Sequence, residues 1–237
     1  MDAAFISAAM LFAIGDIHGH FDKLMDLMAL CRALAEHRGQ SARFVLLGDY
    51  VDRGPASSQV LEFLASRPND VQAIKGNHED LMWRAQTDLA ARDVWMRNGG
   101  IETLESYAAF APDQASTAHL DLIEKLPLFV DDGLRLFVHA GIDPADPDAR
   151  DPAILMWTRQ HPADDAELPR YVVHGHTPTR SRKPDFRNNR LNLDTGAGYG
   201  HALTAAGFDD GMAHPLLFLN HQGDLTATGL TSRTGLV

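Results

Sequence analysis

The sequence has little cysteine, no long apolar run and no block of basic residues, and each of these absences excludes a class of protein. The single cysteine, Cys31, excludes a disulfide framework and a zinc site built from thiolates, and it suits a reducing cytoplasm. No apolar run is long enough to span a bilayer. Lys and Arg number 21 against 32 Asp and Glu, a formal charge of −11, which disfavours binding to nucleic acid or an anionic membrane. We therefore expect a cytoplasmic protein with neither of these partners.

Apolar residues are plentiful, and their arrangement predicts an α/β fold. They make up 45% of the 237 residues, enough for a full core. Short apolar runs recur, and most end at glycine or histidine beside a polar residue, which is typical of strands buried on both faces. Stretches with apolar residues at three-and-four spacing separate the early runs and predict helices. The expected strands in this part are residues 10–14, 44–47, 71–74, 134–138 and 171–173.

Two later segments depart from this alternation. Residues 79–127 are expected to be mostly helical and could cover a site. Beyond residue 185 the pattern becomes strand-like at 190–193, 201–208 and 215–219, and we expect an antiparallel finish there. No linker separates two halves, so we expect a single domain over residues 1–237.

Polar residues with metal-binding chemistry follow the expected strands. The carboxyl ends of strands in an α/β sheet face one crevice, where ligands bind. Carboxylate, amide and imidazole groups suit Mn²⁺, Fe or Zn²⁺, and neighbouring glycines let the backbone turn so that short side chains converge. One such polar residue beside a glycine is a weak signal, but their recurrence after several strands predicts a metal site. The residues in these positions are Asp16, His18, Asp49, Asn77, His78, His139, His174 and His176.

Five motifs containing these residues resemble, in order, the motif set of the calcineurin-like metallophosphoesterases. The form of the second motif is similar to the phosphoprotein phosphatase branch, as is the later Leu193-Asp194-Thr195-Gly196. The motifs are Gly15-Asp16-Ile17-His18-Gly19, Gly48-Asp49-Tyr50-Val51-Asp52-Arg53-Gly54, Gly76-Asn77-His78-Glu79, His139-Ala140-Gly141 and His174-Gly175-His176-Thr177.

The resemblance implies an α-β-β-α sandwich with mixed sheets and a dinuclear metal site at the carboxyl ends of the strands. Two divalent cations can clamp a phosphate and lower the pKa of a bridging water for in-line attack. Mn²⁺ is the expected metal, and Fe or Zn²⁺ would accept the same ligands. The implied ligands are Asp16 and His18 for one cation, Asn77, His139 and His176 for the other, and Asp49 as the bridge.

The same resemblance implies the catalytic groups. His78 matches the proton donor to the leaving alkoxide, and Asp52 matches the carboxylate that orients it. Arg53 would hold phosphate oxygens with its planar fork, and Arg159 is the candidate for a second phosphate arginine. His174 is expected to be satisfied by hydrogen bonds behind the site, although it could instead contact substrate or support a ligand.

Three functions remain open at this point. The first is a serine/threonine protein phosphatase, favoured because Asn98-Gly99-Gly100 resembles a motif of bacterial and phage protein phosphatases. The spacing from His139 to His176 also lacks the longer insertion of the symmetrical diadenosine tetraphosphatases. The second is hydrolysis of diadenosine tetraphosphate or another nucleotide phosphoanhydride. The third, a non-catalytic metal-binding or phosphopeptide-binding module, is disfavoured because every ligand and the proton donor are present. The substrate is expected to be a phosphoprotein or a small phosphorylated molecule, and the sequence predicts no oligomeric state.

Overall fold

The first of two sheets in the described residues contains the first and the last strand of the chain order. The computed structural model describes residues 9–108 and 116–230. The sheet has the order β11-β10-β9-β1-β2-β3, with β1, β2 and β3 parallel and β9, β10 and β11 antiparallel to their neighbours. The strands are β1 (Ala9–Ile14), β2 (Ser41–Leu46), β3 (Val71–Ala73), β9 (Thr204–Phe208), β10 (Leu217–Asn220) and β11 (Leu225–Ala227).

The second sheet corrects one sequence-based prediction. The antiparallel finish holds for β9 to β11, but the strand predicted at 190–193 is β8, which runs parallel to β6. The reason is that β7 and β8 form a hairpin whose second arm enters the sheet beside β6, and apolar periodicity predicts a strand without specifying its neighbour's direction. The order is β4-β5-β6-β8-β7, with β4 (Phe129–Asp131), β5 (Arg135–Val138), β6 (Tyr171–His174), β7 (Asp185–Phe186) and β8 (Arg190–Asn192).

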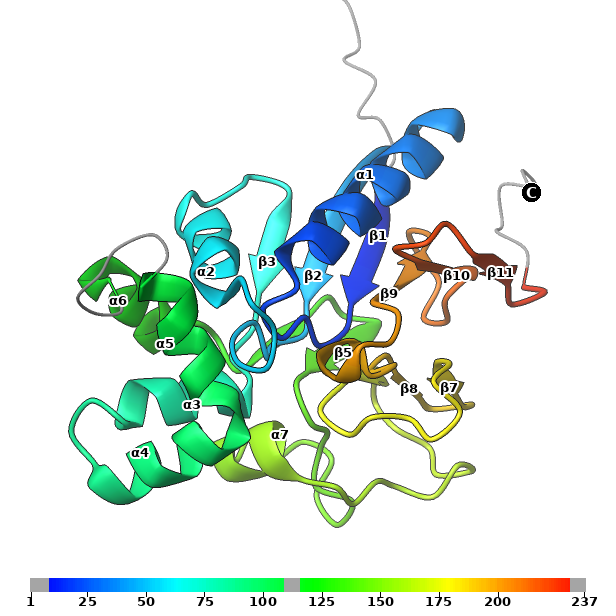
Figure 1. The fold of residues 1–237 in the computed structure, drawn as a ribbon. Helices are drawn as coiled ribbons and strands as arrows, with labels where there is room; N and C mark the ends of the chain where they lie inside the picture. Colours follow the sequence, from blue (N-terminus) through cyan, green and yellow to red (C-terminus); the bar gives the residue numbers. More distant parts are fainter. Residues whose placement is uncertain (1–8, 109–115, 231–237) are drawn as a thin grey trace, which may run out of the picture.

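Alternate residues of the central strands enter two different cores. Phe12 and Phe44 pack beneath α1 (Phe21–His37) and α2 (Ser57–Ala65), whereas their neighbours Ala13 and Val45 pack against the second sheet. This explains why these strands are continuously apolar, since both faces are buried. The outer face of the second sheet packs on Leu155 of α7 (Pro152–Trp157). Four layers result, and the predicted α-β-β-α sandwich is confirmed (Figure 1).

Helices fill most of the segment predicted to be helical. They gather on one side of the sandwich, on the left of Figure 1. Residues 109–115, which fall inside the predicted segment, lie outside the described residues. The elements are α3 (Asn77–Arg84), α4 (Leu89–Trp95), the π-helical turn η1 (Met96–Gly100), α5 (Ile101–Ala108) and α6 (Thr117–Lys125).

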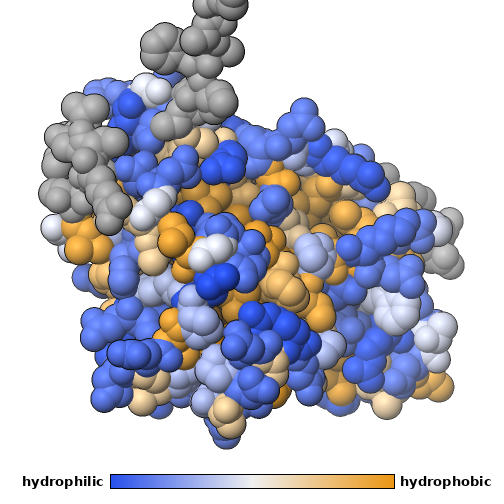
Figure 2. Space-filling view, turned by 180° about the vertical axis from the view of Figure 1, so that it is seen from behind, coloured by the Kyte–Doolittle hydropathy of each residue, from blue (hydrophilic) through white to orange (hydrophobic). Residues whose placement is uncertain are grey.

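The surface seen from behind is mostly hydrophilic in its lower half, with hydrophobic side chains gathered higher up (Figure 2). Within residues 9–108 and 116–230, no helix combines the length and apolar character needed to cross a membrane.

Candidate metal centre

The predicted site residues lie in tight, strained turns that follow the ends of the strands. In β1, β2 and β6 the turn after the strand contains a non-glycine residue with positive φ: His18 (47°), Asp49 (52°) and His176 (68°). Asp52 and Arg53 adopt the same left-handed region at 75° and 70°. Seven described non-glycine residues have positive φ, and five of them are predicted site residues. Such backbone costs about 1–2 kcal/mol per residue, so the strain is concentrated where the function was predicted.

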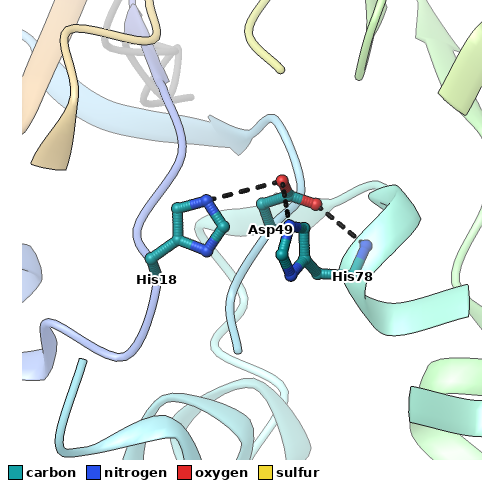
Figure 3. Close-up of side chains that lie close together, drawn as sticks. All are labelled: His18, Asp49 and His78. Atoms are coloured by element: carbon teal, nitrogen blue, oxygen red, sulfur yellow. Dashed lines mark hydrogen bonds and ion pairs between the residues drawn. The ribbon is translucent and has the colours of Figure 1, made fainter. Parts of the chain in front are cut away.

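Asp49 lies at the middle of the cluster (Figure 3). Its Oδ2 is 3.5 Å from His18 Nε2 and 3.8 Å from His78 Nε2, and its Oδ1 is 3.2 Å from His139 Nε2. All four side chains are buried. Burial alone would raise the pKa of Asp49, but the surrounding imidazoles outweigh burial and hold that pKa well below its usual range. The carboxylate is therefore charged and faces ring nitrogens on both sides.

The donors form two groups that share this carboxylate. One group contains His18, Asp49 and His78, and the other contains Asp49, His139 and His176. In each group one ligand atom per residue lies within 4.8 Å of the others. This is a His/Asp site suited to two divalent metals, as the sequence predicted.

Hydrogen bonds fix which ring nitrogens face the centre. His18 Nδ1 donates to Val51 O at 2.9 Å, and His139 Nδ1 donates to Leu47 O at 2.8 Å. Burial lowers the pKa of both rings, so each is neutral and directs an Nε2 lone pair inward. A backbone acceptor behind a ring is the usual way a metal-binding histidine is oriented.

Asn77 supplies the clearest sign that a cation fits. Its Oδ1 is 2.9 Å from His139 Nε2 and 2.9 Å from His176 Nδ1. The ring proton of His139 is on Nδ1, which donates to Leu47 O. The lone pairs of His139 Nε2 and Asn77 Oδ1 therefore face each other with no proton between them. His176 Nε2 is buried and has no partner among the described residues. A divalent cation could bind the lone pairs of His139 Nε2 and His176 Nε2, whereas a neutral hydrogen-bond network leaves these two nitrogens without a proton to accept.

Asp16 lies at the edge of the cluster, outside both groups. Its carboxylate accepts the backbone N–H of His176 at 3.1 Å, and a side chain at Gly175 would collide with it. Burial, together with the nearby carboxylates of Asp194 and Asp49, raises the pKa of Asp16 well above its usual value. Buried carboxylates that repel one another favour a bound cation, which relieves both penalties.

His78 and Asp52 form the predicted pair. His78 Nδ1 donates to Asp52 Oδ2 at 2.6 Å, while Asp52 Oδ1 accepts from Trp95 Nε1 at 2.9 Å and from Thr103 Oγ1 at 2.7 Å. Burial lowers the pKa of His78, but Asp49 and the hydrogen bond to Asp52 outweigh burial and raise it. The ring is therefore suited to hold a proton at Nε2, the atom that faces the centre.

The two arginines occupy different positions. The Arg53 guanidinium lies against His18 Nε2 and 3.0 Å from His78 Nε2, so it reaches the centre directly. Arg159 is exposed at the rim, close enough to contribute to lowering the pKa of His176, and Trp157 two residues before it meets the His176 ring edge-on. No hydrogen bond or ion pair within the described chain links the Arg159 side chain to another predicted site residue.

Sequence reasoning missed several residues that shape the centre. Glu79, fully buried, accepts backbone N–H groups of Asp49, Tyr50, Val51 and Gly76 and so holds the Asp49 turn; its signal was its place directly after the Asn77-His78 pair. The Tyr199 ring stacks on the Arg53 guanidinium at 4.7 Å, a contact that no pattern in the sequence predicts.

His174 lies behind the centre but is only partly satisfied. Its Nδ1 is 3.2 Å from Gly175 O, its ring stacks on His161, and its buried Nε2 has no partner among the described residues. The strand ends at His174, so His176 turns away from it and the two do not share a face.

Comparisons with known proteins give matches over most of the chain. Residues 10–205 match the family model described as calcineurin-like phosphoesterase. The bis(5'-nucleosyl)-tetraphosphatase PrpE (asymmetrical) of Anoxybacillus flavithermus is 30% identical, over 81% of this chain and 87% of that protein. Serine/threonine-protein phosphatase 1 of Salmonella typhimurium is 31% identical, over 83% and 90%. A solved protein serine/threonine phosphatase from Saccharomyces cerevisiae shares the fold with a TM-score of 0.60 and 16% identity, over 88% of this chain and 75% of that one.

Proposed function

Since this chain belongs to the calcineurin-like phosphoesterase family and is a metal-dependent phosphoester hydrolase, we propose that its substrates are phosphoserine and phosphothreonine side chains of proteins. The observation that carries the hydrolase chemistry is the position of Asp49 between two groups of imidazoles. A carboxylate shared in this way can hold two cations close together, an arrangement that stabilises in-line phosphoryl transfer to water.

The proposed ligands keep the roles that the motif positions imply. Asp49 would be shared by the two cations, Asp16 and His18 would help to hold one of them, and Asn77, His139 and His176 would help to hold the other. Bound there, the cations would polarise the phosphoryl oxygens and lower the pKa of a bound water. Mn²⁺ is the metal we propose, because carboxylate, amide and imidazole donors suit it and no thiolate is present.

The chain's own residues perform the remaining steps. Arg53 binds equatorial phosphate oxygens, a task supported by its position against the ring nitrogens that face the centre. His78 holds a proton at Nε2 and donates it to the leaving alkoxide of serine or threonine, while Asp52 orients the ring and keeps it protonated. Arg159, at the rim, supplies a second phosphate contact. Attack by water requires no covalent intermediate, so Cys31, buried away from the centre, takes no part.

Two observations support a protein substrate. The Salmonella relative is named serine/threonine-protein phosphatase 1, and its similarity to this chain covers 90% of that protein. The Asn98-Gly99-Gly100 turn contacts Arg53, whose N–H donates to Gly99 O at 3.4 Å, and Gly99 adopts a φ of 110° where a side chain would collide with Arg53. The motif noticed in the sequence thus supports the phosphate-binding arginine.

A dinucleoside tetraphosphate is the second candidate substrate, favoured by the similarity to the Anoxybacillus enzyme. The test is a parallel assay of the Mn²⁺-loaded chain on a phosphothreonine peptide and on diadenosine tetraphosphate. We expect a higher kcat/KM on the peptide. A preference for the dinucleotide of more than tenfold would overturn this order, and its products would give the position of cleavage, since central attack yields two ADP and off-centre attack yields AMP and ATP.

A further inference from the structure

A basic pocket lies beside the turn that carries Tyr199. It has a volume of about 320 Å³, and the residues that line it include four basic ones and no acidic one among the described residues. They come from four separate parts of the chain: Lys23 from the first turn of α1, Arg182 from the loop after β6, His201 from the loop before β9 and His221 from the turn after β10. We call this the Lys23–Arg182 pocket. In a chain of formal charge −11, such a grouping is unexpected for a solvated surface.

The pocket is joined to the metal centre by one short turn, η2 (Ala197–Tyr199). Lys23 Nζ donates to Ala197 O at 3.3 Å and to His201 O at 2.9 Å, so it holds the first residue of this turn and the residue two positions after its end. Gly198 packs against the His18 ring, where a side chain would collide. Tyr199 lies over Arg53 and is 58% exposed. Tyr199 and His201 are two peptide links apart, so their Cα atoms are at most about 7.6 Å apart.

The Arg182 charge in the pocket has no partner among the described residues. The Arg182 side chain makes no hydrogen bond or ion pair with any residue of 9–108 or 116–230, although its loop holds it with a left-handed φ of 58°. Lys23 stands in the first turn of a helix, where the helix dipole disfavours a cation. Burial lowers the pKa of Lys23, and burial together with the charge of Lys23 lowers the pKa of His221, outweighing the hydrogen bond from Leu203 and the charge of Asp26. An anion in the pocket would relieve these repulsions.

We propose that the Lys23–Arg182 pocket binds a second anionic group of the substrate, a phosphate or carboxylate beyond the scissile phosphate. The proposal rests on the phosphohydrolase function above. The scissile phosphate occupies the centre beside Arg53, the substrate passes over the exposed Tyr199 ring, and the second anion meets the free guanidinium of Arg182. A planar fork of donors suits both phosphate and carboxylate oxygens.

The test compares Arg182→Gln with Lys183→Gln, a neighbouring cation that does not line this pocket. Each Mn²⁺-loaded variant is assayed on p-nitrophenyl phosphate, on diadenosine tetraphosphate, and on two phosphothreonine peptides with acidic or neutral flanking residues. Arg182→Gln should leave kcat/KM for p-nitrophenyl phosphate and the neutral peptide within twofold of the unmodified chain. It should lower kcat/KM about tenfold for at least one doubly anionic substrate, mainly through KM. Lys183→Gln should change none of these values more than twofold.

Each outcome decides the proposal. A fall on the dinucleotide alone identifies the second anion as a phosphate, a fall on the acidic peptide alone identifies it as a carboxylate, and a fall on both shows that the pocket accepts either. No fall on any doubly anionic substrate, or an equal fall on p-nitrophenyl phosphate, overturns it. If the unmodified Mn²⁺-loaded chain does not hydrolyse p-nitrophenyl phosphate, the proposed function fails, whereas normal hydrolysis with an unaffected Arg182→Gln variant refutes the pocket alone.

Discussion

Replacing Asp52 by asparagine tests the proton donor in a way that the structure makes quantitative. Asp52 Oδ2 accepts from His78 Nδ1 at 2.6 Å, and both side chains are buried. A hydrogen bond to a charged partner contributes about 1.5–3 kcal/mol. Since one pKa unit corresponds to about 1.36 kcal/mol, its loss should lower the pKa of His78 by about 1–2 units. Asparagine retains an oxygen for Trp95 and Thr103, so the local packing should survive.

The sign of the expected change follows from the role of His78 as an acid. In the unmodified chain the pKa of His78 is raised, because Asp49 and the hydrogen bond that His78 donates to Asp52 outweigh the effect of burial. A lower pKa leaves the ring unprotonated at lower pH, so the alkaline limb of the kcat profile should move down by about 1–2 units. At a pH above the alkaline limbs of both the unmodified chain and the variant, the kcat of the variant should be about 10–100-fold lower. At a pH below both limbs the difference should be much smaller.

The assay is a pH profile of kcat on a phosphothreonine peptide, with metal content measured on the same samples. Asp70→Asn is the matched control, because Asp70 pairs with Arg32 at the exposed surface and its loss should leave the profile unchanged. The reasoning is refuted if Asp52→Asn keeps both its metals and the alkaline limb stays where it was.

Three further predictions concern other groups of the site and core. His78→Asn should retain both metals while kcat falls about 10²–10⁴-fold; since His78 also lies in one of the two donor groups, loss of a metal in this variant would identify it as a ligand instead. Glu79→Gln should lower the free energy of unfolding by about 3 kcal/mol, because an amide can accept fewer of the four buried N–H groups, and a denaturant titration showing no change would contradict this. Burial raises the pKa of the Cys31 thiol, so native chain should resist a thiol reagent at pH 8 and react once unfolded; rapid labelling of native chain would show that the helix α1 packing is wrong.

The positions of the site residues could be predicted because each follows an apolar run that ends in a turn. Runs such as Met10–Ile14 and Phe44–Leu47 predicted buried strands, and the order of polar residues after them predicted one shared edge. The left-handed backbone of His18, Asp49 and His176 could not be predicted, since aspartate and histidine adopt a positive φ more often than other non-glycine residues but still do so in only a small fraction of cases.

The supporting contacts escaped prediction for a different reason. Asp52 takes hydrogen bonds from Trp95 and Thr103, which are 43 and 51 positions away, and such pairings depend on how the helices pack on the sandwich. Trp95 packs in the core while also donating its indole N–H to Asp52. The parallel pairing of β8 was missed because periodicity contains no information on strand direction.

The position of Asp49 between two cations is tested most directly by anomalous diffraction from crystals grown with Mn²⁺. We expect two peaks about 3.5–4 Å apart on either side of the Asp49 carboxylate, one beside His18 and the other beside Asn77, His139 and His176. A single peak, or peaks that do not touch Asp49, would contradict the shared position of Asp49.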